Sequence, residues 1–383
     1  MLKKPFSLFL SFTIIFFLLS HNFAASETTS LNVSANNAVL MEAESGRVLF
    51  AKDAHEKQRI ASITKIMTAI VAIESGKLKQ KVTISKRAAY TEGSSLYLKP
   101  GDKIRLKDLV YGLMLRSGND AAVAIAEFVG GSVEGFVQLM KEKAEQIGMT
   151  DTMFANPHGL DDHKNMYSTA YDMALLTKYA MKNPTFRKIW GTKIYRVDDP
   201  DGSGVLVWKN KNKLLTRYPY STGGKTGYTT IAKRTLVSTA KKDGMSLIVV
   251  TLNDRNDWED HMNLFNWGFR HYDLVSLVEE GVIPGLENEF YKGKVLARRS
   301  LKYPLTDEER DNISKTINLY KPPKKGRWKT EAPSPVGKMF VQLNNDTIAE
   351  LPLYYKGEPD EKKGFWSWLK EIFLITAGVR VNG

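Results

Sequence analysis

The sequence predicts an α+β fold in which strands flank a helical middle region and a small all-β region follows. Apolar residues recur at helical spacing through most of residues 106–185. On either side of that stretch they occur in short runs that alternate with polar residues or are continuously apolar, as in strands. Adjacent hairpins imply an antiparallel sheet whose faces the helices must cover. We therefore expect a first, α+β domain over residues 32–275.

The elements at the two ends of this domain follow from hydrophobic periodicity and from turn residues. Glu44-Ser45-Gly46 marks the first turn, and Lys241-Lys242-Asp243-Gly244 marks the second. Ser62 opens an apolar-striped helical pattern that ends near Gly76. The expected elements are two strands within 38–50, a helix over 62–76, a hairpin of 235–240 with 245–252, and a closing helix over 255–271.

The remainder of the chain differs in its pattern of apolar residues. Short strand-like runs separated by Pro and Gly predict a small all-β domain over residues 280–355. Over residues 361–378, Trp and Phe recur at helical spacing beside basic residues, which predicts an amphipathic helix at a membrane surface. The alternative for this tail is a helix docked on the protein's own β domain.

The N-terminus predicts export. Lys3 and Lys4 precede an apolar run over residues 8–19, and the small residues Ala24-Ala25-Ser26 follow. This order is typical of a secretory signal peptide, which we place at residues 1–26; an uncleaved anchor is the alternative. The chain of 383 residues has no cysteine, which excludes disulfides, thiolate catalysis and Cys-ligated zinc.

The chain is basic, with a formal net charge of +13. Such a surplus suits nucleic acid, anionic lipid or an anionic cell wall, or is simply a soluble basic surface. Nucleic acid is the poorest fit for an exported protein, so we expect no nucleic-acid partner.

The first candidate catalytic signal is Ser62-Ile63-Thr64-Lys65. A serine hydroxyl becomes a good nucleophile only when a base takes its proton. On a helix, residues three apart share a face, so Lys65 can lie beside Ser62. Burial and a second nearby cation would lower the pKa of the lysine and make it a base. The pattern also occurs at Ser238–Lys241, on an expected strand, and at Ser367–Lys370, on the amphipathic tail.

Two further signals follow along the chain. Ser117-Gly118-Asn119 lies in an expected interhelical loop, where the alternative is an ordinary capped turn. Lys225-Thr226-Gly227 begins an expected strand, and its glycine would allow a substrate backbone to approach closely. A solvent-exposed lysine is the usual meaning of that last tripeptide alone. The three motifs in this order, each on the expected element, form the signature set of penicillin-binding proteins and serine β-lactamases.

The flanking sequence extends the likeness. Residues 59–68, 115–122, 154–160, 167–172 and 224–229 resemble the D-alanyl-D-alanine carboxypeptidases, the low-molecular-mass penicillin-binding proteins of serine type. Within that family the chain looks closest to the sporulation type of bacilli, which acts on spore cortex. The resemblance implies a penicillin-binding/β-lactamase-like domain with an all-helical subdomain. It also implies an enzyme on the outer face of the cytoplasmic membrane that trims peptidoglycan stem pentapeptides and is acylated by β-lactam antibiotics.

The resemblance also implies a role for each motif residue. Ser62 would be the acylated nucleophile, Lys65 the general base, and Ser117 the group that passes a proton to the leaving D-alanine. Asn119 would order the site. The substrate-binding positions would be Lys225 and Thr226 for the terminal carboxylate, Gly227, and Tyr228, whose backbone N–H would form an oxyanion hole with that of Ser62. Some family members use an arginine for the carboxylate, for which Arg255 is a loose candidate.

Three alternatives remain open on the same sequence. A β-lactamase is disfavoured because Gly118 stands where class A enzymes carry Asp, and because no deacylating Glu before a Leu-Asn pair occurs between residues 120 and 225. A transpeptidase on the same fold and a catalytically inactive wall-binding or penicillin-sensing protein are the others. His158 and His163, with Asp161 and Asp162, fit no standard zinc spacing, so we expect no metal and no cofactor.

Overall fold

The structure is a computed structural model, and it describes residues 31–200, 202, 204–322 and 333–356. The expected signal peptide over 1–26 and the expected amphipathic helix over 361–378 lie outside the described residues. Within the described part of the chain, no single helix has the length and apolar composition needed to cross a bilayer. The bent pair Asn119–Gly130 and Val133–Ile147 would meet both criteria together.

The first domain is built on a five-stranded antiparallel sheet in the order β2-β1-β9-β8-β7. Its strands are β1 (Asn37–Glu42), β2 (Val48–Lys52), β7 (Ser221–Thr229), β8 (Lys233–Lys242) and β9 (Met245–Leu252). The first and last parts of the domain meet where β1 pairs with β9, with Val39 opposite Val250. All six residues of β1 are buried, because this strand lies between β2 and β9 and both of its faces are covered.

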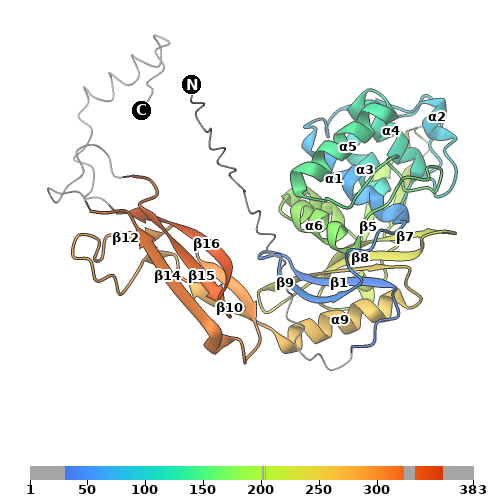
Figure 1. Cartoon of the computed structure of the whole chain (residues 1–383). Helices are drawn as coiled ribbons and strands as arrows, with labels where there is room; N and C mark the ends of the chain where they lie inside the picture. The colour runs from blue at the N-terminus through green and yellow to red at the C-terminus, as the bar shows by residue number, and fades with distance from the viewer. Residues whose placement is uncertain (1–30, 201, 203, 323–332, 357–383) are drawn as a thin grey trace, which may run out of the picture. The chain divides into compact units, whose positions relative to one another are not determined.

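Helices cover the two faces of the sheet, as Figure 1 shows. The closing helix α9 (Asp257–His271) packs on β8 and β9 from one side. On the other side α6 (Ala170–Met181) packs on β1 and β9, and helix α1 (Lys65–Glu74) packs in turn on α6. The α+β architecture predicted from periodicity is therefore confirmed.

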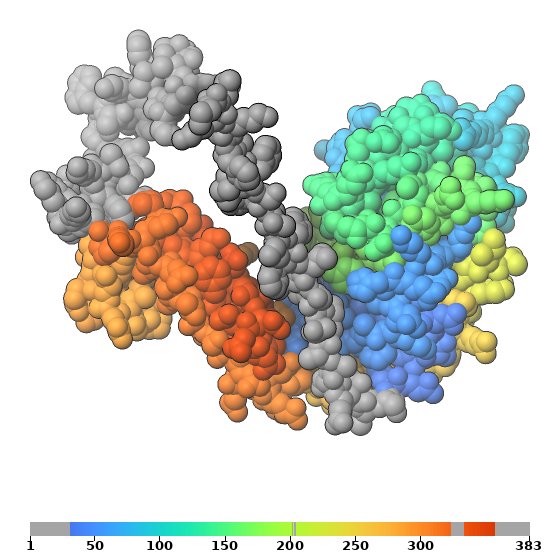
Figure 2. All heavy atoms as spheres, in the orientation of Figure 1, coloured from blue at the N-terminus to red at the C-terminus, as the bar shows by residue number. Residues whose placement is uncertain are grey.

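The helical subdomain shares one large hydrophobic core with strands β1, β8 and β9. Its main helices are α1 (Lys65–Glu74), α3 (Leu106–Arg116), α4 (Asn119–Gly130), α5 (Val133–Ile147) and α7 (Pro184–Trp190). Side-chain caps begin several of them: the Ser132 hydroxyl accepts from Gly135 N at α5, and Asn183 Oδ1 accepts from Thr185 N at α7. In Figure 2 the cyan and green surface of these helices continues directly into the blue surface of the first strands.

Several short elements were not expected from the sequence. The helix α2 (Lys86–Ala89) and the paired strands β3 (Lys81–Thr83) and β4 (Lys103–Arg105) lie between α1 and α3. The strands β5 (Ile194–Asp198) and β6 (Val205–Lys209) form a hairpin on α3. Strands β3 and β4 escape detection because each has three residues, of which only the middle one is apolar and buried.

The chain then forms an all-β region with its own core. A two-stranded sheet pairs β10 (Asp273–Val278) with β13 (Leu301–Leu305). A five-stranded sheet has the order β11-β12-β16-β15-β14. Its strands are β11 (Gly281–Val282), β12 (Val295–Ala297), β14 (Ile313–Leu319), β15 (Gly337–Leu343) and β16 (Asp346–Tyr355). The expectation of a C-terminal all-β domain is confirmed.

Candidate active site

The candidate nucleophile lies in a tight turn just before α1. Ser62 belongs to a 3-10 turn, Ala61–Thr64, and α1 begins at Lys65, so Ser62 does not itself open the α-helix. Ala61 has a positive φ of 48°, an uncommon conformation for a residue with a Cβ atom. Gly159 packs against this backbone, since a Cβ built there would lie 1.9 Å from the Ala61 carbonyl oxygen. The strained residue before Ser62 is therefore held by a close glycine contact.

The structure brings Lys65 and Ser62 together. Lys65 Nζ lies 2.9 Å from Ser62 Oγ, within hydrogen-bond distance. It also donates to Asn119 Oδ1 at 2.7 Å and to the His158 carbonyl oxygen at 2.7 Å. Lys65 is fully buried, with no exposed surface.

These three partners can accommodate a neutral amine. An uncharged amine has two hydrogens and one lone pair, whereas an ammonium has three hydrogens and no acceptor. Asn119 Oδ1 and the His158 carbonyl oxygen are both acceptors and take the two hydrogens. An ammonium would donate its third hydrogen to Ser62 Oγ, whereas the lone pair of a neutral amine can accept the hydroxyl hydrogen of Ser62. This arrangement suits a base that takes the serine proton.

The electrostatics favour the same protonation state. Burial is the largest cause that lowers the pKa of Lys65 well below its ordinary value, and the positive charges of Lys225 and Lys211 lower it further. The carboxylate of Asp120 acts in the opposite direction and raises the pKa of Lys65. Desolvation and a like charge are two independent ways to disfavour an ammonium, and both operate here.

The other two motifs meet at a second buried lysine. Lys225 Nζ donates to Ser117 Oγ at 3.0 Å and to the Thr226 carbonyl oxygen at 2.6 Å. Ser117 caps the C-terminus of α3 with a left-handed φ of 66°, which turns its side chain toward β7. Burial, followed by the charge of Lys211, lowers the pKa of Lys225 to about 7. The hydrogen bonds of Lys225 therefore connect the interhelical loop at Ser117 to strand β7.

The glycine of the third motif packs against the backbone of Ser62. A Cβ built at Gly227 would lie 2.9 Å from Ser62 N and 2.4 Å from Thr235 Oγ1. Strand β7 is an edge of the five-stranded sheet, and Tyr228 at its end is 65% exposed. The Thr226 side chain is partly exposed on the same strand. An edge strand next to the Ser62 turn can pair with an extended peptide.

Sequence reasoning missed two contributors to this site. Lys211 lies at the exposed rim after β6, with Nζ 3.3 Å from Ser94 Oγ, and it lowers the pKa of both buried lysines. The backbone carbonyl of His158 is the other, and no side-chain motif can mark a carbonyl. Arg255, the loose candidate for binding a carboxylate, is exposed between β9 and α9.

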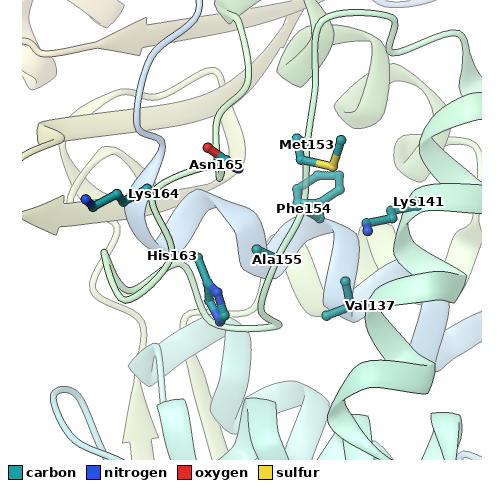
Figure 3. A pocket seen from close by; sticks show the side chains of 8 residues that line it. All are labelled: Val137, Lys141, Met153, Phe154, Ala155, His163, Lys164 and Asn165. Atoms are coloured by element: carbon teal, nitrogen blue, oxygen red, sulfur yellow. The ribbon is translucent and has the colours of Figure 1, made fainter.

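The loop that contains His158 is a structural wall of the site. His158 is buried and accepts from Leu160 N through Nδ1 at 3.2 Å; burial and nearby cations lower its pKa to about 3. A hollow of about 390 Å³ lies between this loop and α5, and Figure 3 shows Lys141, Phe154 and His163 among its lining residues. Among the described residues no group of three or more His, Asp or Glu side chains is arranged to hold a metal ion.

Comparisons with known proteins agree with this geometry. Residues 22–256 match the peptidase S11 family, described as D-alanyl-D-alanine carboxypeptidase. Residues 272–361 match the C-terminal domain of penicillin-binding protein 5. The D-alanyl-D-alanine carboxypeptidase DacF of Bacillus subtilis is 34% identical over 362 residues, which cover 90% of each chain. DacC of Escherichia coli is 34% identical over 388 residues, which cover 92% of this chain and 91% of DacC.

Solved structures show the same fold. Penicillin-binding protein 5 of Haemophilus influenzae superposes with a TM-score of 0.70 at 28% identity, covering 86% of this chain and 98% of its own. A mutant of a Streptomyces DD-transpeptidase superposes with a TM-score of 0.60 at 33% identity, covering 62% of this chain and 99% of its own. The family expected from the three motifs is confirmed: the chain belongs to the peptidase S11 family of serine-type D-alanyl-D-alanine carboxypeptidases.

Proposed function

We propose that the protein removes the terminal D-alanine of peptidoglycan stem pentapeptides through an acyl-enzyme on Ser62. The observation that supports this most strongly is the buried Lys65 amine, which has two acceptors for its hydrogens and the Ser62 hydroxyl at 2.9 Å. Ser62 Oγ attacks the carbonyl of the penultimate D-alanine while Lys65 takes the hydroxyl proton. The C–N bond then breaks, and Ser117 relays the proton that Lys65 took to the leaving amine, which leaves Lys65 neutral again.

The remaining motif residues bind the substrate and the developing charge. Lys225 and Thr226 face the terminal carboxylate. The backbone N–H groups of Ser62 and Tyr228 stabilise the oxyanion. Each donor of this kind typically lowers the free energy of the transition state by about 3 kcal/mol. Water then attacks the ester on Ser62, which releases the tetrapeptide and restores the hydroxyl. Because each cleavage removes a donor peptide, the activity limits cross-linking.

Mass mapping of a covalent adduct tests this mechanism. A fluorescent penicillin should label the protein, and the adduct should map to the peptide containing Ser62, because the β-lactam carbonyl and carboxylate mimic the natural substrate. Release of D-alanine from a soluble pentapeptide should require the same residue. An adduct elsewhere, or D-alanine release by Ser62→Ala, contradicts the proposal.

A transpeptidase is the second candidate, and the likeness to a Streptomyces DD-transpeptidase favours keeping it. The two reactions share the acyl-enzyme and differ in whether water or an amine accepts the acyl group. Adding an acceptor amine to the pentapeptide assay distinguishes them. Hydrolysis predicts tetrapeptide as the product at every amine concentration, whereas transfer predicts a new peptide bond. Rapid turnover of a penicilloyl-enzyme would indicate a β-lactamase instead.

We further propose that the enzyme is exported and held at the outer face of the membrane by its C-terminal amphipathic segment. The basic, Trp-rich sequence after residue 361 supports this. Truncation before Lys362 should release the protein from membranes with less than about a twofold change in activity on a soluble peptide. Undiminished membrane retention contradicts it. The resemblance to the sporulation type supports action in the forespore envelope, which loss of the gene tests through the cross-linking of cortex peptidoglycan.

A further inference from the structure

A segment outside the three motifs is fastened to the start of α4 beside the catalytic residues. It comprises residues 92–98, between α2 and β4. Its Ser94 carbonyl accepts from Asn119 N at 2.6 Å, and its Glu92 carbonyl accepts from Asn119 Nδ2 at 2.7 Å. The second bond matters chemically. Because it occupies the Asn119 amide nitrogen, it fixes which end of that side chain, the carbonyl oxygen, faces Lys65.

One buried carboxylate holds this segment in place. Asp120 has no exposed surface, and its Oδ2 accepts from Ser95 Oγ at 2.6 Å, Leu96 N at 2.8 Å and Leu98 N at 3.3 Å. Its Oδ1 accepts from Ala121 N at 2.8 Å. A buried ionised carboxylate is stable only when it is hydrogen-bonded in this way. Three of the four donors come from the segment 92–98.

The close packing explains the middle residue of the second motif. A Cβ built at Gly118 would lie 2.7 Å from Leu96 Cγ and 2.7 Å from Asp120 Oδ1. A larger residue at this position would have to displace the side chain of Leu96 or that of Asp120. Within the segment, Tyr97 has a left-handed φ of 64° and is 86% exposed, while its neighbours Leu96 and Leu98 are buried. The segment is therefore held in an unusual conformation by contacts that converge on Asp120.

We propose that Asp120 is a positioning residue of the catalytic site, which holds segment 92–98 against α4 so that the Asn119 carbonyl oxygen stays on Lys65 Nζ. This inference rests on the proposed role of Lys65 as the base. Asp120 touches no reacting atom and acts through Asn119. It also adds a negative charge near Lys65, where the charges of Lys225 and Lys211 oppose it. His158 contributes its carbonyl oxygen to Lys65 from the opposite wall.

The test compares Asp120→Asn with Asp172→Asn. Asp172 is a matched control, because it is also buried in the first turn of a helix and its Oδ2 accepts one backbone N–H and one hydroxyl, from Asp151 at 2.9 Å and Thr152 at 2.7 Å. We expect Asp120→Asn to lower kcat about 10- to 100-fold, since small misplacements of catalytic groups have effects of this size. Its acidic limb of kcat/KM should move to lower pH, because a negative charge near Lys65 is lost. Asp172→Asn should lose stability but keep the kcat and the acidic limb of the unaltered enzyme.

Ser95→Ala is the milder second variant, which removes one bond to Asp120 and leaves its charge. It should lower kcat less than Asp120→Asn and leave the acidic limb in place. The inference is overturned if folded Asp120→Asn has the kcat and the acidic limb of the unaltered enzyme. It is also overturned if Asp172→Asn shows the same fall in kcat and the same displacement of the acidic limb. If Asp120→Asn does not fold, an unchanged kcat in Ser95→Ala overturns it. Failure of the proposed function is separate and would appear as an unaltered protein that forms no adduct on Ser62.

Discussion

Two of the three Ser-x-x-Lys patterns in this sequence, at Ser62 and at Ser238, have opposite structural properties. At Ser62–Lys65 the two side chains meet at 2.9 Å in a buried site. At Ser238–Lys241 both residues lie on β8, where the Ser238 hydroxyl is buried 2.6 Å from His261 Nδ1 and Lys241 is exposed. Residues three apart share a face of a helical turn but lie on opposite faces of a strand. Secondary structure therefore decides which of two identical patterns can be a catalytic pair.

The largest expected effect comes from removing each serine. Ser62→Ala should lower D-alanine release by at least about 10⁴-fold, because the nucleophile is lost. Ser238→Ala should keep its activity per folded molecule and lose about 1–3 kcal/mol of stability, because His261 Nδ1 is left without its hydroxyl partner in the core. Pentapeptide assays and thermal unfolding of both variants check this. Loss of activity in folded Ser238→Ala would contradict the comparison.

Exchanging each lysine for arginine sharpens the same contrast. Lys65→Arg should lower kcat by about 10³-fold, since an arginine side chain keeps its proton and cannot act as a base. Lys241→Arg should be within about twofold of the unaltered enzyme, because an exposed cation is replaced by another. The rate of penicillin acylation measures both. A Lys65→Arg protein that is acylated at the normal rate would mean that another group takes the serine proton.

Two glycines extend the comparison to the backbone. Gly227→Ala should lower activity about 100-fold, because the new methyl group would displace Ser62 N or Thr235 Oγ1. Gly244, in the turn after Lys241, has a φ of +85° and no atom within 4 Å of a built Cβ. Gly244→Ala should therefore lower only the melting temperature, through backbone strain. Equal activity losses in the two variants would argue against a tight contact at Gly227.

The smallest expected effects are those of pH, and they depend on the two buried lysines. The proposed mechanism requires a neutral Lys65, so kcat/KM should rise with pH, and this acidic limb should lie well below the pH at which an ordinary lysine titrates. It should fall again above about pH 7, where Lys225 loses the charge that attracts the substrate carboxylate. A bell-shaped profile is the expected outcome, and a profile without the alkaline limb would remove Lys225 from carboxylate binding.

The lowered pKa of Lys225 also predicts how the stability of the protein varies with pH. The pKa of Lys225 falls from 10.5 in an unfolded chain to about 7 in the folded protein. Between those values the unfolded chain binds more protons, so the free energy of unfolding should rise with pH across this window. Replacing Lys225 with methionine should reduce the rise, and the part that remains comes from Lys65, whose pKa is also lowered on folding. Melting temperatures of the two proteins at pH 7 and pH 9 provide the measurement.

Much of the fold was predictable because long amphipathic elements carry their own period. The hairpin of β8 and β9, the closing helix α9 and the helices of the middle region follow from apolar spacing and turn residues. The hairpin of β5 and β6 was missed because its outward positions are apolar, with Val205 57% exposed, so alternation gives no signal. The stretch 148–169 contains no helix, and its backbone is held instead by side chains such as that of Asn156, which accepts from Gly159 N.

By itself the sequence determined the class of fold, the order of the three motifs and, through the residue types in them, the chemistry to look for. Only the tertiary structure decided that Ser62 precedes the helix in a strained turn, that a backbone carbonyl at His158 completes the surroundings of Lys65, and that Lys211 adds its charge. The physical reason is that residue types and local periods are properties of the chain, whereas desolvation and charge–charge contacts arise between segments distant in sequence. The pKa of a lysine depends on those contacts. A motif can therefore suggest which lysine acts as a base, but the tertiary structure sets its pKa.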